Sequence, residues 1–504
     1  MGTGDGSAEI LPDGREESSC DMNLEAIVGL EIHAQLLTNT KMFCSCSTEF
    51  GAAPNTQVCP VCLGLPGALP VVNRRAVEIV IGVGLAARSA VGGRSVFARK
   101  NYFYPDLPKN YQISQYDAPL CRGGRVRFLM DGQIRTVELA RIHLEEDAGK
   151  SLHLGTGDEG ATLVDFNRCG VPLIEIVTQP AALSPSEAHS FLASLKLALD
   201  YLGASSGRME EGSLRCDVNV SVRQRGESRL GKKTEIKNLN SFKNVERALE
   251  YEIARHTDEL IHNRTPGGET LLWDAACEKA VVMRGKEEAR DYRYFPEPDL
   301  LALDVGPEWV ESLGAGLPEL PLDKQIRFVR DYGLPAYDAE VLCSGRDLAA
   351  YFEEVVGLVV DAKLTSNWIM TEVMRELKSG ESAILKTRVS PANLAELLRF
   401  QREGRISGRM AKEIFGKMVG TGRSAREIVE GESLSRMTDP GDIRKTVEEV
   451  VSENPKAVAQ YLEGKEKSFT FLMGRMMKKT GGTVDPEAAN RALLEHLKGL
   501  RRSS

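Results

Sequence analysis

The chain has 504 residues, of which 42% are hydrophobic and 27% charged, and its formal net charge is −8. This length exceeds what a single hydrophobic core usually supports, so we expect two to four domains in a soluble globular protein. Since no apolar run is long enough to span a bilayer, the sequence excludes a membrane protein. The negative charge disfavours non-specific wrapping of nucleic acid but permits a local basic surface.

Residues 1–21 are rich in Gly, Ser, Asp and Glu, which predicts a disordered N-terminal extension and leaves Met22 as an alternative start. This segment has neither the apolar core of a secretory signal nor the basic residues of a transit peptide, so we expect a cytoplasmic protein. Ten cysteines in such a chain indicate a reducing compartment, where clustered cysteines bind metal more often than they form disulfides.

Short alternating runs separated by turn residues dominate residues 22–298 and predict a mainly antiparallel sheet. Helices are expected over residues 73–88, after an Asn cap, and over residues 184–202, where the first turn has capping-box spacing. Between them, Asp131-Gly132 predicts a tight hairpin, because this pair readily adopts the positive φ angles of a type I′ turn.

Near residues 298–320 the composition changes, and residues with high helical propensity dominate the rest of the chain. This predicts a helical domain over residues 299–430. Turn signals near residue 431 then separate a small helical tail over residues 431–504. The expected fold class is α+β, with a sheet domain followed by two all-α parts.

Two strands in the first domain carry polar side chains on one face, because strand side chains alternate between faces. In the strand over residues 28–34, Glu31 and His33 share a face. For one strand alone, an ordinary half-solvated sheet is the better explanation. Because a second strand has the same polar face, we favour a functional site. The second strand places these residues on one face: Arg215, Asp217, Asn219, Ser221 and Arg223.

Four cysteines form a C-x-C-x12-C-x2-C pattern. Two closely spaced pairs allow a tetrahedral Zn²⁺ site in which all four positions are filled, so the site would be structural. The alternative is a set of unrelated buried cysteines. The predicted zinc ligands are Cys44, Cys46, Cys59 and Cys62.

Carboxylates at other strand ends extend the polar set. Glu175 interrupts an apolar strand, where an unpaired carboxylate would be costly to bury. We take Glu146 as a further ligand, with Glu145 as the alternative. Together with Glu31 and His33, these oxygens suit Mg²⁺ or Mn²⁺ better than Zn²⁺, and phosphoryl transfer is the chemistry that most needs such a site. Basic residues that could contact phosphate are Lys100, Arg215 and Arg223.

Two further segments have the composition of nucleic-acid contacts. Residues 97–112 mix aromatic and basic side chains, as RNA-binding surfaces do, although loop packing explains the aromatics equally well. A basic run in the tail is equally compatible with a solvated helix face and with a nucleic-acid contact. Its basic residues are Lys465, Lys467, Arg475, Lys478 and Lys479.

Long non-repetitive motifs identify a family resemblance. Beyond Met22 the chain resembles the B subunit of the bacterial and organellar aspartyl/glutamyl-tRNA amidotransferase over nearly its whole length. Besides the four cysteines, the motifs are VGLEIHAQL (28–36), RKNYFYPDLPK (99–109), HLEEDAGK (143–150), MEEGSLRCD (209–217), KNLNSF (237–242) and DYRYFPEPD (291–299).

The resemblance implies a cradle-shaped catalytic domain with a zinc-binding insertion, a helical domain, and a tail that contacts tRNA. It implies ATP-dependent phosphorylation of the side-chain carboxylate of Glu-tRNA(Gln) or Asp-tRNA(Asn), followed by amidation with ammonia. The Mg²⁺ ligands would be Glu31, His33, Glu146 and Glu175, with Lys100 and Asp217 in support and with Arg215, Asn219 and Arg223 at the nucleotide. The partners would be a glutaminase subunit and a small third subunit, because this chain lacks the Ser-Ser-Lys signature of the amidase.

Two alternatives are weighed against this interpretation. The archaeal tRNA-dependent amidotransferase subunit shares the cradle but has an inserted domain, for which residues 299–320 leave no room. A zinc-stabilised tRNA-binding scaffold without catalysis would not need metal ligands clustered on one sheet face. The sequence does not discriminate between Glu-tRNA(Gln) and Asp-tRNA(Asn) as substrate.

Overall fold

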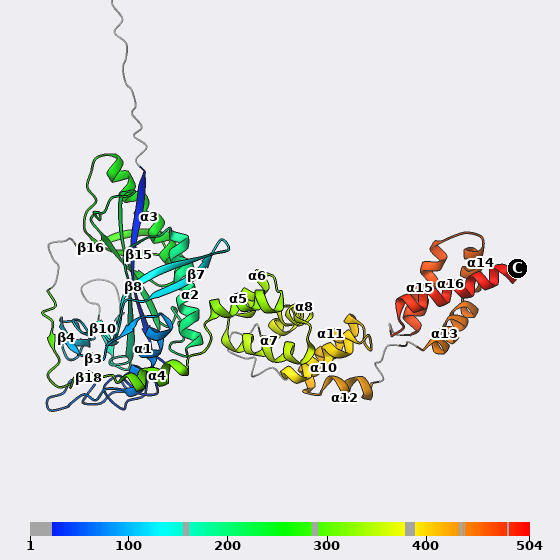
Figure 1. The fold of residues 1–504 in the computed structure, drawn as a ribbon, viewed down its shortest axis with the longest axis horizontal. Helices are drawn as coiled ribbons and strands as arrows, with labels where there is room; N and C mark the ends of the chain where they lie inside the picture. Colours follow the sequence, from blue (N-terminus) through cyan, green and yellow to red (C-terminus); the bar gives the residue numbers. More distant parts are fainter. Residues whose placement is uncertain are drawn as a thin grey trace, which may run out of the picture. The chain divides into compact units, whose positions relative to one another are not determined.

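The computed structural model describes residues 23–154, 161–284, 291–377, 389–432, 437, 439–480 and 483–503 (Figure 1). The predicted N-terminal extension lies outside the described residues. The chain divides into two compact units, Met1–Leu322 and Asp323–Ser504. No described helix is both long and apolar enough to cross a membrane.

An 11-stranded sheet forms the centre of the first unit, in the order β16-β15-β14-β13-β1-β11-β8-β6-β2 with β7 and β12 at its sides. Within it, all described strand pairs are antiparallel except β14 with β15. Its strands are β1 (Leu24–Gln35), β2 (Ala90–Val91), β6 (Cys121–Arg122), β7 (Arg125–Met130), β8 (Gln133–Glu146), β11 (Pro172–Thr178), β12 (Ala181–Ala182), β13 (Leu214–Gln224), β14 (Thr234–Leu239), β15 (Thr270–Asp274) and β16 (Lys279–Arg284).

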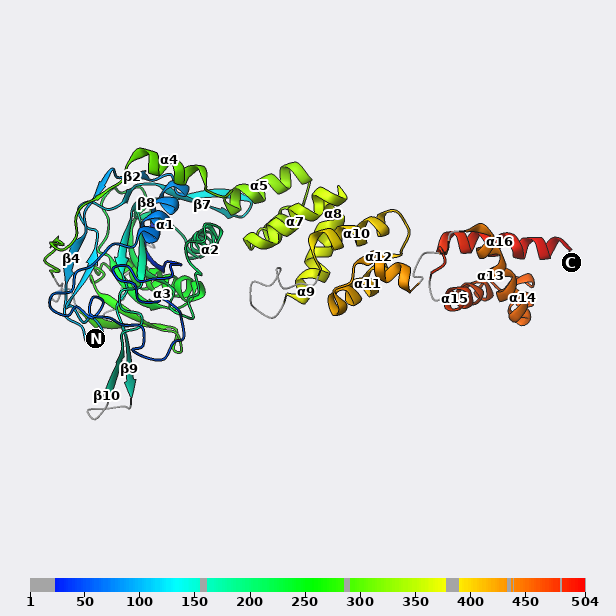
Figure 2. The same ribbon diagram turned by 90° about the horizontal axis from the view of Figure 1, so that it is seen from below.

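Three small sheets complete the unit. One joins β17, β4 and β5, another joins β18 and β3, and the hairpin of β9 and β10 stands apart from the main sheet (Figure 2). Their strands are β3 (Arg94–Ser95), β4 (Ala98–Asn101), β5 (Tyr111–Ser114), β9 (Lys150–Leu154), β10 (Ala161–Asp165), β17 (Phe295–Pro296) and β18 (Leu303–Asp304).

Helices cover the apolar side of the main sheet, and the local signals predicted from sequence are present. Asn73 caps α1 (Arg74–Ala86), and Ser184 forms a capping box at the start of α2 (Pro185–Tyr201). The predicted hairpin joins β7 to β8 through Asp131 and Gly132, both with positive φ. Helix α3 (Phe242–Ile261) packs against α2 and β13. These elements bury one continuous apolar core.

The boundary between the units lies further along the chain than residue 298. Helix α4 (Pro307–Ala315) contacts α1, and Trp309, Val310 and Leu313 pack against the core of the first unit. The segment up to Leu322 therefore belongs to the sheet unit. The amino-acid composition becomes helix-like before residue 322, but α4 still packs its apolar side on α1 of the sheet unit.

The second unit is helical and contains two separate apolar clusters, over residues 328–429 and 443–497. Their separation is consistent with a helical part followed by a tail. The helices are α5 (Pro321–Tyr332), α6 (Ala336–Leu342), α7 (Arg346–Val359), α8 (Ala362–Trp368), the π-helical η2 (Ile369–Val373), α9 (Met374–Glu376), α10 (Pro391–Arg402), α11 (Gly408–Thr421), α12 (Ala425–Gly431), α13 (Pro440–Glu453), α14 (Pro455–Leu462), α15 (Lys467–Lys479) and α16 (Pro486–Ser503).

Two glycines on α1 should respond in opposite directions to replacement by alanine. A Cβ at Gly84 would overlap the Cys121 sulfur of β6, whereas a Cβ at Gly82 would meet Leu317 Cδ2 at an ordinary 3.6 Å. Alanine favours a helix by roughly 0.8–1 kcal/mol over glycine. We therefore expect Gly82→Ala to raise the unfolding midpoint in urea and Gly84→Ala to lower it by overpacking. Equal effects of the two variants would contradict this packing of α1.

Candidate active site

Three side chains from neighbouring strands converge on the polar face of the main sheet: His33, Glu145 and Glu175. Their ligand atoms all lie within 4.8 Å of one another. The Nε2 atom of His33 is 3.4 Å from a carboxylate oxygen of Glu175 and 3.8 Å from one of Glu145. One imidazole and two carboxylates at this spacing can hold a divalent cation such as Mg²⁺ or Mn²⁺.

Strand register explains this convergence. Glu175 of β11 lies opposite His33 of β1 on one side and opposite His143 of β8 on the other. Because side chains alternate along a strand, Glu145 projects on the same face as His143. The side chains of Glu145 and Glu175 are 2% and 8% exposed, whereas that of His33 is 21% exposed. Access to the cluster is therefore from the His33 side.

Hydrogen bonds orient Glu145. The Ser114 hydroxyl donates to its Oε1 at 2.6 Å, and the Gln112 amide donates to its Oε2 at 3.1 Å, both from β5. The His143 Nε2 atom lies 3.4 Å from Glu145 and 3.2 Å from Glu175. Such outer contacts commonly fix the orientation of metal-binding carboxylates.

Charge compensation keeps the two buried carboxylates ionised. Burial alone would raise the pKa of Glu175, but His143 and His33 hold it well below its usual range. For His143, burial has the opposite effect and lowers the pKa, but the carboxylates of Glu175 and Glu145 raise it to about 9. Those carboxylates also raise the pKa of the half-buried Lys100 ammonium. Glu145 and Glu175 are therefore ionised and offer carboxylate oxygens, the ligand type that Mg²⁺ prefers.

A second row of polar groups continues across β1, β13 and β14. Asp217 lies opposite Glu31 in the strand register, and Lys237 Nζ donates to the Asp217 carboxylate at 2.7 Å. The Asn219 amide donates to Glu31 at 3.0 Å, while its buried Oδ1 atom has no hydrogen-bond partner in the described part of the chain. Buried polar atoms are normally hydrogen-bonded, so the unpaired Oδ1 atom suggests that a ligand donates a hydrogen bond to it.

Arg215 lies beside these rows. Its Nη2 atom donates to Asp147 at 2.6 Å, and its side chain remains 42% exposed. It lies opposite His33 in the strand register, so it is close enough to the cluster to meet an anionic ligand.

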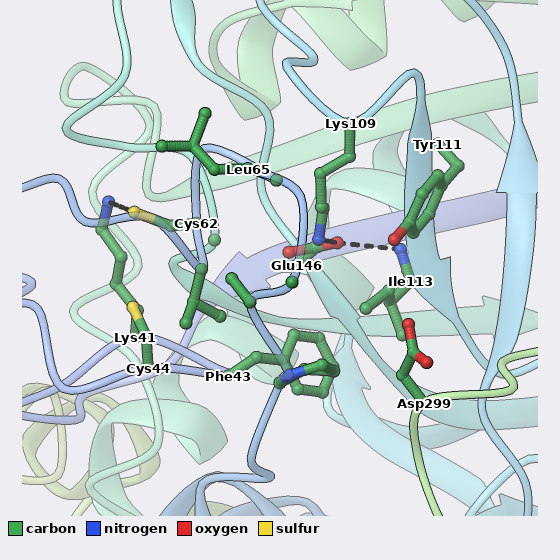
Figure 3. Close-up of a pocket in the computed structure, with 16 residues that line it drawn as sticks. Lys41, Phe43, Cys44, Cys62, Leu65, Lys109, Tyr111, Ile113, Glu146 and Asp299 are labelled. Carbon is green, nitrogen blue, oxygen red and sulfur yellow. Dashed lines mark hydrogen bonds and ion pairs between the residues drawn. The ribbon is translucent and has the colours of Figure 1, made fainter.

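Glu146 does not join the cluster, which corrects the choice of this residue over Glu145. Its side chain projects on the opposite side of β8, where it accepts bonds from Lys109 and from the Ile113 N–H (Figure 3). Glu31, two residues from His33, lies on the polar face but is not part of the compact group.

Arg223 is also not brought to the site. It is eight residues from Arg215, a distance of roughly 26 Å along a strand, and it pairs with Glu25 at 2.9 Å. The shared face of β13 was predicted correctly, but the length of the strand separates its two arginines.

The four predicted cysteines do come together. The Sγ atoms of Cys44, Cys46, Cys59 and Cys62 lie within 4.8 Å of one another. The Cys44 thiol lowers the pKa of Cys62 to about 4, with further contributions from the Cys59 N–H and the charge of Lys41. Lys41 is fully buried, and its Nζ atom lies 3.7 Å from Cys62 Sγ and 3.2 Å from the Phe166 carbonyl.

A pocket of about 200 Å³ adjoins this cluster, lined by Lys41, Cys44, Cys62, Lys109 and Glu146 among others (Figure 3). It lies on the Glu146 side of β8, so the cysteine cluster and the carboxylate cluster occupy opposite sides of the same strand end. Cys169 donates to the Cys62 carbonyl at 3.4 Å, and the Gly170 N–H donates to the Asp147 carbonyl at 2.8 Å. These bonds connect the cluster to the strands that carry the site.

His143, Gln112 and Ser114 were not predicted as site residues. The alternation of β8 contains a signal for His143, since Ile142 and Leu144 face the core and His143 and Glu145 must then share the other face. No sequence signal identifies Gln112 and Ser114, because β5 and β8 meet only in the folded chain.

Comparisons with known proteins identify the family of this chain. Residues 26–311 match the GatB/GatE catalytic domain family, and residues 350–497 match the GatB domain family. The B subunit of the aspartyl/glutamyl-tRNA(Asn/Gln) amidotransferase of Moorella thermoacetica is 50% identical over 476 residues, which cover 94% of this chain and 100% of that protein. The corresponding protein of Chlorobium phaeobacteroides is 51% identical over 478 residues, covering 95% and 100%.

The chain belongs to the family of these amidotransferase B subunits. Membership confirms the resemblance inferred from the motifs. The first matched range contains the carboxylate and cysteine clusters, and the second contains the basic residues of α15.

Proposed function

We propose that this chain is the subunit in which ATP activates the side-chain carboxylate of a misacylated Glu-tRNA(Gln) or Asp-tRNA(Asn), and in which ammonia then forms the amide. The relatives are named for an aspartyl/glutamyl-tRNA(Asn/Gln) amidotransferase, which supports this substrate class. The observation that carries the proposal is the buried His33–Glu145–Glu175 cluster with Lys100 beside it.

The reaction has two parts. Transfer of the ATP γ-phosphoryl group to the side-chain carboxylate gives an acyl phosphate and ADP. Ammonia then attacks the carbonyl carbon, inorganic phosphate leaves with the electron pair of the broken C–O bond, and the nitrogen loses one proton to phosphate or solvent to give the neutral amide. A carboxylate is a poor electrophile, so the phosphate serves as the leaving group. Both parts require cationic groups that hold phosphate oxygens.

His33, Glu145 and Glu175 would hold Mg²⁺, which when bound supplies positive charge to the transferred phosphoryl group. The donor set of one imidazole and two carboxylates fits that ion. Three cations near the cluster could bind the remaining phosphate oxygens: Lys100, Arg215 and Arg141, whose Nη2 atom lies 3.8 Å from a Glu175 oxygen. Ser114 and Gln112 keep Glu145 in place.

The second polar row would position the acceptor. Lys237 holds Asp217, and Glu31 holds the amide of Asn219, whose free Oδ1 atom can accept a hydrogen bond from ammonia or from a substrate hydroxyl. Ammonia is scarce at neutral pH, so a glutaminase subunit would supply it within a complex that contains a small third subunit. We expect this complex in the cytoplasm, with translation.

The cysteine cluster would bind a structural Zn²⁺, because four sulfur ligands leave no position for water. The buried Lys41 ammonium fits a zinc site of this kind: four thiolates and one Zn²⁺ carry a net charge of −2, and Lys41 offsets part of it at Cys62.

The tail would contact tRNA through one face of α15. Lys467, Arg475 and Lys478 are exposed and fall on one side of the helix, together with Phe471, whose ring lies 5.6 Å from the Arg475 guanidinium. Lys479 differs, because it pairs with Glu449 and Glu453 of α13. A basic face with an exposed aromatic ring is typical of RNA contacts.

A scaffold that only binds tRNA is the competing function. It requires no paired carboxylates at a histidine, and it predicts that substitutions there change stability alone. Turnover measurements therefore separate the two functions.

Glu145→Gln should abolish most turnover in the assembled complex. It keeps the size and shape of the side chain but removes a charge needed for the divalent cation, so we expect kcat to fall about 100-fold or more. The assay is ATP-dependent amide formation on Glu-tRNA(Gln), with ammonium in place of glutamine. Glu246→Gln, at a paired carboxylate on α3, is the control and should remain active. Full activity of Glu145→Gln would remove this cluster from the mechanism.

Lys41→Met should weaken zinc binding without removing a ligand. We expect the purified chain to contain one zinc ion, and the variant to release it to a competing chelator with about 10- to 100-fold lower affinity. Metal analysis combined with chelator titration measures this. Cys62→Ser is the positive control for loss of a ligand. Unchanged affinity in Lys41→Met would show that its charge does not act on the cluster.

Substitution of both Lys467 and Lys478 by alanine should weaken tRNA binding and reduce its salt dependence. Each lost phosphate contact lowers the slope of log K against log salt by about 0.7 to 0.9. The measurement is the Kd for tRNA at several salt concentrations, and the KM for ATP should not change. Lys479→Ala, which removes a neutralised lysine, should have a smaller effect. Equal losses of tRNA affinity in the two variants would contradict the assignment of this face of α15 to tRNA binding.

A further inference from the structure

Four tyrosines gather beside the carboxylate cluster, and nothing in the proposed chemistry uses their rings. This tyrosine cluster consists of Tyr102, Tyr116, Tyr292 and Tyr294. Tyr116 and Tyr294 are stacked, with ring centroids 4.1 Å apart and planes 8° from parallel. Tyr292 makes edge contacts with Tyr294 at 6.2 Å and with Tyr102 at 6.0 Å.

Strand pairing brings the cluster to the site. The ring of Tyr292 lies 5.1 Å from Lys100 Nζ, and Lys100 of β4 lies opposite Gln112 of β5, which donates to Glu145. Burial raises the pKa of Tyr294 to about 12, with Glu145 and Glu175 adding to the effect.

The residue between two of these tyrosines has an unfavourable backbone conformation. Arg293, between Tyr292 and Tyr294, has a φ of +44°, which is uncommon for a residue other than glycine. Asn101 and Asp291 fix it: the Asn101 amide donates to the Arg293 carbonyl at 2.8 Å, and the Arg293 N–H donates to Asp291 at 2.9 Å. Local strain kept by such bonds is common at binding sites.

One ring of the cluster is open to a ligand. Tyr116 is 51% exposed, and its single ring partner within the described residues is Tyr294. Phe103, Tyr104 and Phe295, one or two residues along the chain from cluster members, are also exposed. Exposed aromatic side chains are common at interaction sites, where a ligand covers them. An aromatic ring that stacks on one face only can accept a planar ring on its other face.

We infer that the tyrosine cluster is a stacking site for an adenine ring, with Tyr116 as the contacting ring and Lys100 placed to meet the attached phosphate or ribose. This inference rests on the proposed function, because the combination of a planar base and an anionic group next to the carboxylate cluster describes an adenosine-containing substrate. Two substrates carry adenosine: ATP, and the 3′-terminal nucleotide of the aminoacyl-tRNA.

Tyr116→Ala, Tyr116→Phe and the control Tyr337→Ala test this in the assembled three-subunit complex. Tyr337 is 68% exposed and lies in the second unit. One arm measures the Kd and KM for ATP, with CTP for comparison. The other measures the Kd for uncharged tRNA with and without its 3′-terminal adenosine. The binding measurements need no turnover.

Because Tyr116→Ala removes the stacking ring, its affinity for one of the two ligands should fall by about 5- to 100-fold. The preference for ATP over CTP, or for tRNA with its terminal adenosine, should shrink with it. Tyr116→Phe keeps the ring and should lose much less. The affected arm identifies which adenosine binds.

The inference is overturned if Tyr116→Ala changes neither binding constant by more than twofold while the complex stays assembled. If the wild-type complex binds both ligands but forms no amide, the proposed function fails and the stacking result still stands on the binding arms. If turnover is normal and both arms are unchanged, only the stacking site is wrong.

Discussion

The register of β1 between β11 and β13 is the constraint on which the candidate site depends. In this register His33 lies opposite Glu175 on one side and Arg215 on the other, while Glu31 lies opposite Asp217. A shift of one residue would turn His33 toward the core and place Ile32 on the polar face. The apolar face of the same strand, with Leu30, Ile32 and Ala34 almost fully buried, makes such a shift costly.

Burial of charge is the second requirement, and it links side chains that are distant in sequence. Glu145 and Glu175 are nearly inaccessible to water, and an isolated buried carboxylate would lose much of its hydration energy. His143, Lys100 and the donors on β5 replace that hydration. The site therefore exists only when β4, β5, β8 and β11 are all in place, so its geometry depends on the whole sheet unit.

The end of β8 carries two adjacent glutamates with different partners. Glu145 faces the carboxylate cluster, whereas Glu146 faces Lys109 and the pocket next to the cysteines. The bonds from Cys169 and Gly170 extend this connection to the loop between β10 and β11. Hydrogen bonds therefore join the loop of the cysteine cluster to the residues that directly follow Glu145 and Glu146.

Local chemistry in the sequence determined much of this protein. The caps of α1 and α2, the Asp131-Gly132 hairpin, the polar faces of β1 and β13 and the meeting of the four cysteines follow from short-range rules, because each depends on residues close together in the chain. The motifs also identified the family. Alternation along β8 could have chosen Glu145 over Glu146. Only the tertiary structure decided which strands are neighbours, and so placed Ser114 on Glu145, Tyr116 on Tyr294 and α4 on the sheet unit. These contacts join residues whose separation in sequence contains no information about their distance in space.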